Sequence, residues 1–190
     1  MPTPARQARA VFDAETITVY QAYPPEIAGP AVGAGTFVPP LGMHRMTWIK
    51  PSFLWMMYRA GWATKPGKER VLAIRIRREG FLQALSGACL SAFDPAHHES
   101  MEAWREQLHS TTVRVQWDPE RTMTGAALPH RSLQVGISGA TVAQYVQEWI
   151  VDLTDITASL PAIRAGEQPL PDERPFALPP EIGSRLGATG

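Results

Sequence analysis

The chain has 190 residues with 44% hydrophobic content, a length that suits one sizeable core and is short for two full domains. Its 18 Lys and Arg balance 18 Asp and Glu, and its single cysteine excludes an intrachain disulfide and a cysteine cluster for zinc. Because no apolar run is long enough to span a membrane and the first residues lack the apolar segment of a secretory signal, we expect a cytoplasmic protein without a membrane partner.

The first third of the chain predicts two strands and two helices. Residues 15–23, ETITVYQAY, alternate between two sets of side chains and are rich in β-branched residues, so we expect a strand that precedes every other element. A short helix within residues 26–35 and a strand over residues 46–49 follow. The next helix is expected to begin at Pro51 and to end before Gly61, since proline suits a first helical position and glycine a helix end.

This second helix carries the apolar run FLWMMY over residues 53–58, which covers almost its whole circumference and predicts a central position. We expect Trp55 and the neighbouring methionines to be core residues, not ligand contacts. Thr47, Trp48 and Lys50 lie where the preceding strand leads into the helix, a place where backbone N–H groups can face an anion.

The middle of the chain predicts further strands and helices in alternation. We expect strands over residues 70–78, 111–118 and 131–137, and helices over residues 79–93 and 98–110. Cys89 falls within the first of these helices, as a buried side chain. Ser138 is expected to cap a helix whose apolar residues, from Val142 to Leu153, share one face.

From about residue 158 the periodicity disappears, and the last 33 residues contain six prolines. This composition favours a tail that Phe176 and Leu178 attach to the domain. We therefore divide the chain into a single α+β domain, residues 1–157, and a partly docked proline-rich tail, residues 158–190.

The charge is unevenly distributed along the chain. Residues 1–80 hold 11 Lys and Arg against 5 Asp and Glu, and nine basic residues lie between Arg45 and Arg78 with Glu69 as the only acid. If these cations share a face, they would attract an anionic ligand; the alternative is an ordinary solvated surface.

Several familiar catalytic motifs are absent from the sequence: the phosphate loop GxxxxGK[ST], GxGxxG, GxSxG and HExxH. The adjacent His97 and His98 lack the one-face spacing of a metal site, so we expect no metal.

Two polar segments remain as candidates for chemistry. His130 and Arg131 directly precede a predicted strand, where a base or an anion ligand can lie, although a lone histidine there is more often structural. The segment QWDPER contributes Gln116, Asp118, Glu120 and Arg121, and one of its carboxylates can accept a proton or stabilise a developing positive charge. An ordinary Asp-Pro turn is the alternative for this segment.

The order of the segments ITVYQAYPPEIA, GTFVPP, RMTWIKPSFLWMMYRAGWATKPGKERVLAIRI, VQWDPER and RSLQVGI strongly resembles an uncharacterised family, domain of unknown function 4291, over nearly the whole chain. More distantly, the succession of a YxAY strand, an EIAxxAxxxGxF helix, a VLAI strand, a carboxylate-bearing strand and LPH before another strand is similar to compact ADP-ribosyltransferase-like proteins. The second resemblance implies an α+β fold with small, mainly antiparallel sheets that form a cleft for NAD and helices packed around them.

This resemblance also implies roles for individual residues. Tyr20 or Gln21 and the segment from Thr47 to Lys50 would hold the nicotinamide part of NAD, although Gln21 stands where many of those proteins have arginine or histidine. Gln116, Asp118 or Glu120 would act at the ribose, where an oxocarbenium-like centre needs stabilisation. The candidate catalytic residues are therefore Gln116, Asp118, Glu120 and His130, and the candidate cofactor-binding residues are Tyr20, Gln21, Arg45, Thr47, Trp48, Lys50, Arg121 and Arg131.

We expect a protein that binds NAD or a related nucleotide, with phosphates held by the basic residues that begin at Arg45 and a ring stacked on Trp48 or Tyr20. As an enzyme it would be an NAD-dependent glycosyl (ADP-ribosyl) transferase that modifies or processes nucleic acid. The alternatives are a non-catalytic nucleotide- or RNA-binding module and a protein-interaction domain whose acidic half binds a basic partner. The sequence leaves the choice between enzyme and binding module open.

Overall fold

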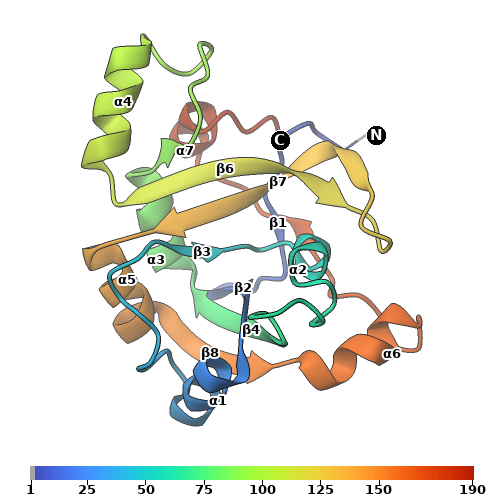
Figure 1. The fold of residues 1–190 in the computed structure, drawn as a ribbon. Coiled ribbons are helices and arrows are strands. Elements are labelled where there is room, and N and C mark those ends of the chain that lie inside the picture. Colours follow the sequence, from blue (N-terminus) through green and yellow to red (C-terminus); the bar gives the residue numbers. More distant parts are fainter. Residues whose placement is uncertain (1–2) are drawn as a thin grey trace.

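Two small sheets lie at the centre of the computed structural model, which describes residues 3–190 (Figure 1). One sheet has the order β2 (Thr16–Tyr23), β4 (Arg70–Arg77) and β8 (Ile150–Asp155), and the other has the order β3 (Thr47–Ile49), β7 (Ala127–Ile137), β6 (Val113–Arg121) and β5 (Cys89–Leu90). All pairs are antiparallel except β5 with β6, and the short β1 (Arg9–Ala10) pairs with β9 (Arg174–Pro175). The predicted α+β fold with small, mainly antiparallel sheets is confirmed.

Within residues 3–190, a backbone bridge links the two sheets where β2 meets the residue that follows β3. The Tyr20 N–H donates to the Lys50 carbonyl oxygen at 2.8 Å, and these two residues form an isolated bridge outside the named pairings. This bridge holds β2 beside β3, although Thr47 lies 27 positions after Tyr20 in the sequence.

Seven α-helices surround the sheets in the described part of the chain (Figure 1). They are α1 (Pro25–Ala34), α2 (Phe53–Ala60), α3 (Arg78–Ser86), α4 (Met101–Ser110), α5 (Ala140–Gln144), α6 (Leu160–Arg164) and α7 (Pro180–Arg185), with a π-helical turn at Tyr145–Trp149 and a 3-10 turn at Thr157–Ser159. Among residues 3–190, no helix has the length and apolar character needed to cross a membrane.

Two hydrophobic clusters use opposite faces of β2 and β4. Val19 and Ile74 point into the larger cluster, which also takes in β6, β7 and α3. Tyr20 and Val71 have the opposite orientation and point into a smaller cluster with α2 and α6. This alternation is the period of two that predicted these strands. The predicted central position of α2 is confirmed, because Trp55 and the neighbouring methionines are buried.

The ends of α2 show how its sequence sets its length. Ser52 is the N-cap, and its side-chain oxygen accepts a hydrogen bond from the Trp55 N–H at 3.2 Å, so Pro51 precedes the helix and does not begin it. Gly61 ends the helix as predicted, with φ of 58°, a conformation that glycine adopts without strain.

Three other expectations were wrong, two in their boundaries and one in its place along the chain. The helix predicted over residues 79–93 ends at Ser86, and Cys89 and Leu90 form the edge strand β5. The helix predicted from Ser138 to Leu153 begins after Gly139 and ends at Trp149, and Ile150–Asp155 is the strand β8. The strand predicted over residues 15–23 is β2, and it is not the first element, because β1 precedes it. Short apolar runs fit helical and strand periods equally well, so pairing with β6 and β4 decided the first two cases.

Residues 158–190, which we predicted as a partly docked tail, run along the domain from α6 to α7. Phe176, Ile182 and Leu186 are buried in the larger cluster. The Leu186 carbonyl oxygen accepts a hydrogen bond from the Trp117 indole nitrogen at 2.7 Å. This segment therefore forms part of the main core.

Candidate functional site

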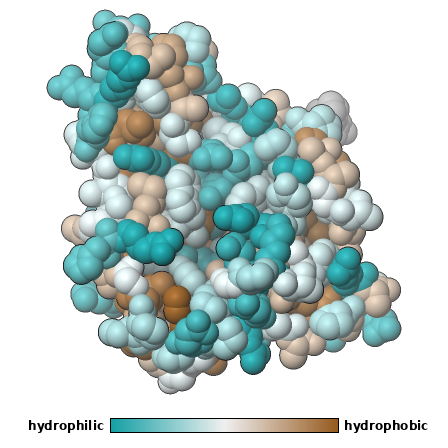
Figure 2. All heavy atoms as spheres, in the orientation of Figure 1, coloured by the Kyte–Doolittle hydropathy of each residue, from teal (hydrophilic) through white to brown (hydrophobic). Residues whose placement is uncertain are grey.

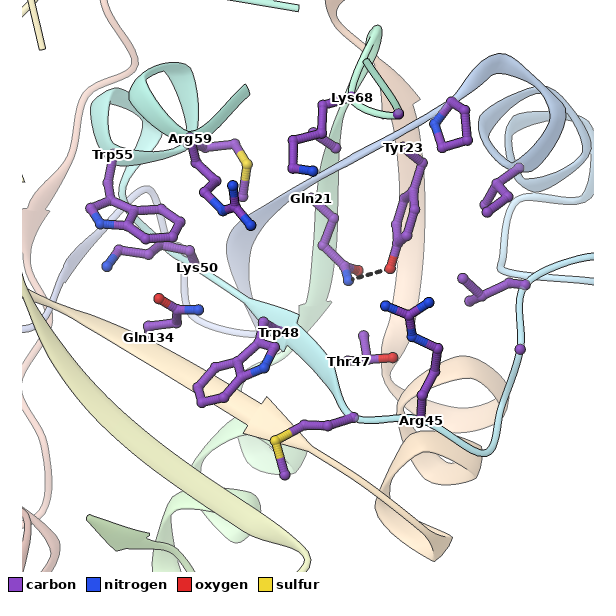
Figure 3. A pocket seen from close by; sticks show the side chains of 18 of the residues that line it. Gln21, Tyr23, Arg45, Thr47, Trp48, Lys50, Trp55, Arg59, Lys68 and Gln134 are labelled. Atoms are coloured by element: carbon purple, nitrogen blue, oxygen red, sulfur yellow. Dashed lines mark hydrogen bonds between the residues drawn. The ribbon is translucent and has the colours of Figure 1, made fainter. Parts of the chain in front are cut away.

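A cavity of about 680 Å³ opens where β2, β3 and α2 come together. Its walls come from the end of β2, the loop between α1 and β3, β3 itself, α2, the turn before β4 and one residue of β7 (Figure 3). On the molecular surface, hydrophilic side chains gather at the centre of the face shown in Figure 2, over the region of β3 and α2. The volume falls in the range of small-molecule and cofactor sites.

Four cations line this cavity: Arg45, Lys50, Arg59 and Lys68. Within residues 3–190, no Asp or Glu is among the lining residues. Arg45, Arg59 and Lys68 come from three separate segments, the loop before β3, the helix α2 and the turn before β4. Figure 3 shows Arg59 reaching into the cavity between Trp55 and Gln21. The lining is therefore electropositive.

The cavity also gathers most of the unpaired cations of the protein. Thirteen of the 18 Lys and Arg side chains make an ion pair or a hydrogen bond within residues 3–190. The five others are Arg45, Arg59, Lys68, Arg105 and Arg164, and the first three line the cavity. Cations that gather on one cavity repel one another, so an anionic ligand would stabilise this arrangement.

The cations in the second half of the basic segment, from Arg70 to Arg78, have partners within the protein. Arg70 pairs with Asp155 at 3.2 Å, and Arg75 pairs with Asp13 at 3.1 Å. Arg77 and Arg78 donate to backbone carbonyl oxygens. The nine basic residues thus do not form one anion-binding face, and only the part around the cavity keeps free cations.

Lys50 lies in the interior wall of the cavity and already has a counterion. Its side chain is 1% exposed, and its Nζ is 2.9 Å from an oxygen of Asp118 and 3.9 Å from the centroid of the Trp55 ring. Burial lowers the pKa of Lys50 to about 8, and the Asp118 carboxylate opposes this shift. The other Asp118 oxygen accepts a hydrogen bond from Gln116 Nε2 at 2.7 Å. The lysine charge is therefore compensated within the protein.

Trp48 provides the aromatic wall. It lies opposite Gly136 in the pairing of β3 with β7, and a Cβ at Gly136 would come within 2.9 Å of the indole. Because glycine has no side chain, Trp48 rests against the strand while it lines the cavity. Trp55 is less suited to stack on a ligand, since Lys50 covers its ring.

A hydrogen-bonded chain of three side chains closes the end of the cavity at β2. The Tyr145 hydroxyl donates to Gln21 Oε1 at 2.7 Å, and Gln21 Nε2 donates to the Tyr23 hydroxyl at 2.9 Å. Burial raises the pKa of Tyr23 to about 12, against the opposing charge of Arg45. Tyr23 therefore remains protonated near neutral pH.

The structure brings together five of the residues selected from the sequence and separates the others. Gln21, Arg45, Thr47, Trp48 and Lys50 line the cavity, and Asp118 and Gln116 stand behind Lys50. Tyr20 packs edge-on against Phe53, with ring centroids 5.6 Å apart, and does not line the cavity.

The remaining candidates lie elsewhere. Glu120 is buried beside α2 and accepts hydrogen bonds from Ser52 Oγ at 2.8 Å and the Arg121 N–H at 2.9 Å. The Arg121 guanidinium lies 3.8 Å from the centroid of the Tyr58 ring. Arg131 donates to the Trp117 carbonyl oxygen and borders a separate cavity of about 240 Å³, which Gln116 also lines. His130 is half-buried in β7 and does not line either cavity.

Five residues of the site were not named individually as candidates from the sequence: Tyr23, Arg59, Lys68, Gln134 and Tyr145. Arg59 and Lys68 nevertheless belong to the basic segment from Arg45 to Arg78 that we expected to hold phosphates. For two of the five residues, the spacing in the sequence indicated a side-chain direction toward the site. Tyr23 shares a strand face with Gln21, and Arg59 follows Trp55 by one helical turn. Gln134 and Tyr145 reach the site only through strand pairing and the π-helical turn, which no local pattern indicates.

Two comparisons with known proteins add to this description. A family model described as "Domain of unknown function (DUF4291)" matches residues 7–176. No curated protein matches the chain. The matched region includes every residue that lines the cavity.

Proposed function

The chain belongs to the family described as Domain of unknown function (DUF4291), and from the geometry of its cavity we propose that the protein binds NAD or a related nucleotide there. The main support for this proposal is the convergence of three cations, Arg45, Arg59 and Lys68, on one cavity that no carboxylate of residues 3–190 lines. Within these described residues, their side chains make no hydrogen bond or ion pair. Phosphate groups are the anions that such a set of Arg and Lys side chains binds well.

The rest of the cavity suits the uncharged parts of a nucleotide. Trp48 offers a ring for stacking, and Gln134 and Thr47 add polar atoms beside it. The resemblance of the segment order to NAD-binding transferase-like proteins makes NAD the first ligand to test within this class.

A compact nucleotide fits the charge distribution better than a long nucleic acid does. RNA binding depends on cations spread along a surface that follows the phosphate backbone. Here Arg70, Arg75, Arg77 and Arg78 bind carboxylates or carbonyl oxygens of the protein itself. Three of the five cations that stay unpaired within residues 3–190 line the cavity.

A binding function without turnover is favoured over transfer chemistry by one observation. The two carboxylates of β6 are already engaged, Asp118 with Lys50 and Glu120 with Ser52, and neither lines the cavity. Transfer at the anomeric carbon needs a group that reaches the sugar. We therefore propose a nucleotide-binding module, and assays for nicotinamide release from NAD test the alternative, a transferase.

Thermal unfolding with NAD, ATP and a short single-stranded RNA tests the proposal directly. A ligand that binds the folded state raises Tm by mass action, and we expect this effect from NAD or ATP. Replacing Arg45, Arg59 or Lys68 by Ala should weaken binding about tenfold each, measured by calorimetry, since each removes a charged hydrogen bond to phosphate.

Arg105→Ala is the matched control, because Arg105 is also unpaired but lies on α4, outside the cavity. Its affinity for nucleotides should equal that of the wild type. Equal weakening by all four substitutions would contradict binding in the cavity, and nicotinamide release that depends on Glu120 would favour the transferase.

A further inference from the structure

The direction of hydrogen bonds at the β2 end of the cavity follows from Tyr145. This tyrosine is 0% exposed, and among residues 3–190 the only partner of its hydroxyl is Gln21 Oε1, at 2.7 Å. A buried hydroxyl proton without an acceptor is costly, so it must point at the amide oxygen of Gln21. The orientation of the Gln21 amide is thereby fixed.

Because its oxygen faces Tyr145, Gln21 presents its NH2 group to Tyr23. Gln21 Nε2 donates to the Tyr23 oxygen at 2.9 Å, so that the Tyr23 proton points away from Gln21. Within residues 3–190 this proton has no acceptor, and Tyr23 lines the cavity. The hydroxyl is therefore an oriented donor that faces the ligand space.

The surroundings of Tyr23 indicate which acceptor it meets. Arg45 lies close enough for its charge to lower the pKa of Tyr23, and Figure 3 shows the guanidinium pointing toward the hydroxyl end of the ring. Gln21 is 2% exposed, and its second Nε2 hydrogen has no partner in the described residues. Three donors thus gather at one end of the cavity, an arrangement that suits an anionic oxygen.

We propose that Tyr23 and Arg45 together bind a phosphate oxygen of the nucleotide, and that Gln21 and Tyr145 are positioning residues that direct the Tyr23 proton toward it. This inference rests on the proposed function and adds to it the part of the ligand that is recognised at β2. Tyr145 lies outside the cavity and acts only through Gln21.

Tyr23→Phe removes the donor and keeps the ring, which packs edge-on against Phe37 with centroids 5.4 Å apart. We expect the affinity for ADP, measured by calorimetry, to fall about tenfold or more, the usual effect of losing a hydrogen bond to a charged group. The affinity for adenosine, which has no phosphate, should be unchanged. Tyr20→Phe is the control, because Tyr20 lies on the same strand but points into the other cluster.

A double-mutant cycle tests the positioning role. In Tyr145→Phe the Gln21 amide can turn, its oxygen can accept the Tyr23 proton, and ADP binding should weaken; in the Tyr23→Phe background the same change should have no further effect. A simple loss of packing would lower Tm equally in both backgrounds without this coupling.

Three results would overturn the inference: unchanged ADP binding by Tyr23→Phe, an equal loss of adenosine binding, or additive effects of the two substitutions on ADP affinity. If Tyr145→Phe does not fold, the ADP and adenosine affinities of Tyr23→Phe alone test the inference. If the wild type bound neither ADP nor NAD, the proposed function would fail with it, whereas wild-type binding that Tyr23→Phe leaves unchanged would refute this inference alone.

Discussion

Glu173 places a half-buried carboxyl group at the N-terminus of α2. One of its oxygens accepts a hydrogen bond from the Phe53 N–H at 2.6 Å, which ties residues 158–190 to the helix. Burial raises the pKa of Glu173 to about 8, and the charge of Glu120 adds to this effect. A carboxyl group in this position favours its protonated form.

This pKa predicts a stability that depends on pH. Since the pKa of folded Glu173 lies above the ordinary value of 4.5, its protonated form contributes fully below about pH 4.5, and this contribution is lost as the pH rises to 8. Glu173→Gln keeps an acceptor for Phe53, so we expect it to raise the free energy of unfolding at pH 8 by on the order of 1–3 kcal/mol and to change it little at pH 4.5.

Urea unfolding of both proteins across this pH range measures the difference. Asp172→Asn provides the control, because it removes a neighbouring negative charge from a side chain that is 90% exposed. A gain that is the same at every pH, or that Asp172→Asn reproduces, would contradict the assignment to Glu173.

The sequence could not reveal which charged side chains of the site are neutralised by a partner. Lys50 and Trp48 stood out because they precede a helix in a basic segment, whereas the state of Asp118 depends on its distance from Lys50. The sequence shows a carboxylate in an Asp-Pro pair and cannot show that a lysine 68 residues away neutralises it. Whether a charged group is free for catalysis is decided by its partners in space.

At the scale of elements, the pairing of β3 with β7 positions the aromatic wall of the cavity. Gly136 is the point of closest approach, where a Cβ would come within 2.8 Å of the Met46 sulfur and 2.9 Å of the Trp48 ring. Real Cβ contacts are not this short, so any larger residue would displace β3 or rotate the indole into the cavity.

We therefore expect Gly136→Ala to lower the free energy of unfolding by about 1–3 kcal/mol and to weaken nucleotide binding. Chemical denaturation and calorimetry measure the two effects. Gly42→Ala, in the loop that lines the same cavity, has open space at its Cβ and should change neither quantity. Wild-type stability and affinity in Gly136→Ala would show that Trp48 does not depend on this close approach.

The ends of helices and strands could be predicted from the sequence where a local capping residue sets them. The predictions were wrong where pairing with a distant strand sets the end of an element. Gly61 ended α2 as predicted, because its positive φ is a property of the residue and its turn. Ile150–Asp155, in contrast, continued a helical pattern and became a strand because it pairs with β4. The π-helical turn before it brings Tyr145 to Gln21. Local periodicity carries no information on either contact.

At the scale of the whole molecule, the last residues complete the core. Phe176 is 2% exposed and packs against Phe12 and Phe81, with ring centroids 5.1 and 6.0 Å away. The N-terminal and C-terminal ends of the described chain lie near each other in Figure 1, and Thr189 exchanges hydrogen bonds with Arg6. Both ends are therefore held in the fold.

Phe176→Ala should lower the free energy of unfolding by about 3–5 kcal/mol, because it removes a large side chain from a filled core. Leu170→Ala, at a position that is 42% exposed in the same segment, should change it by about 0.5 kcal/mol or less. Equal effects of the two substitutions in urea unfolding would indicate that the segment contributes little to the core.

The sequence by itself determined the α+β class, most strands, the central helix α2 and the basic segment that supplies the cavity, because these depend on the period of apolar residues and on local caps and composition. Only the tertiary structure decided which cations stay unpaired, which carboxylates are neutralised and which tyrosine faces the cavity. Those properties are set by distances between residues far apart in the chain, and the energy of a charge or a hydrogen bond depends on the partner it finds in space.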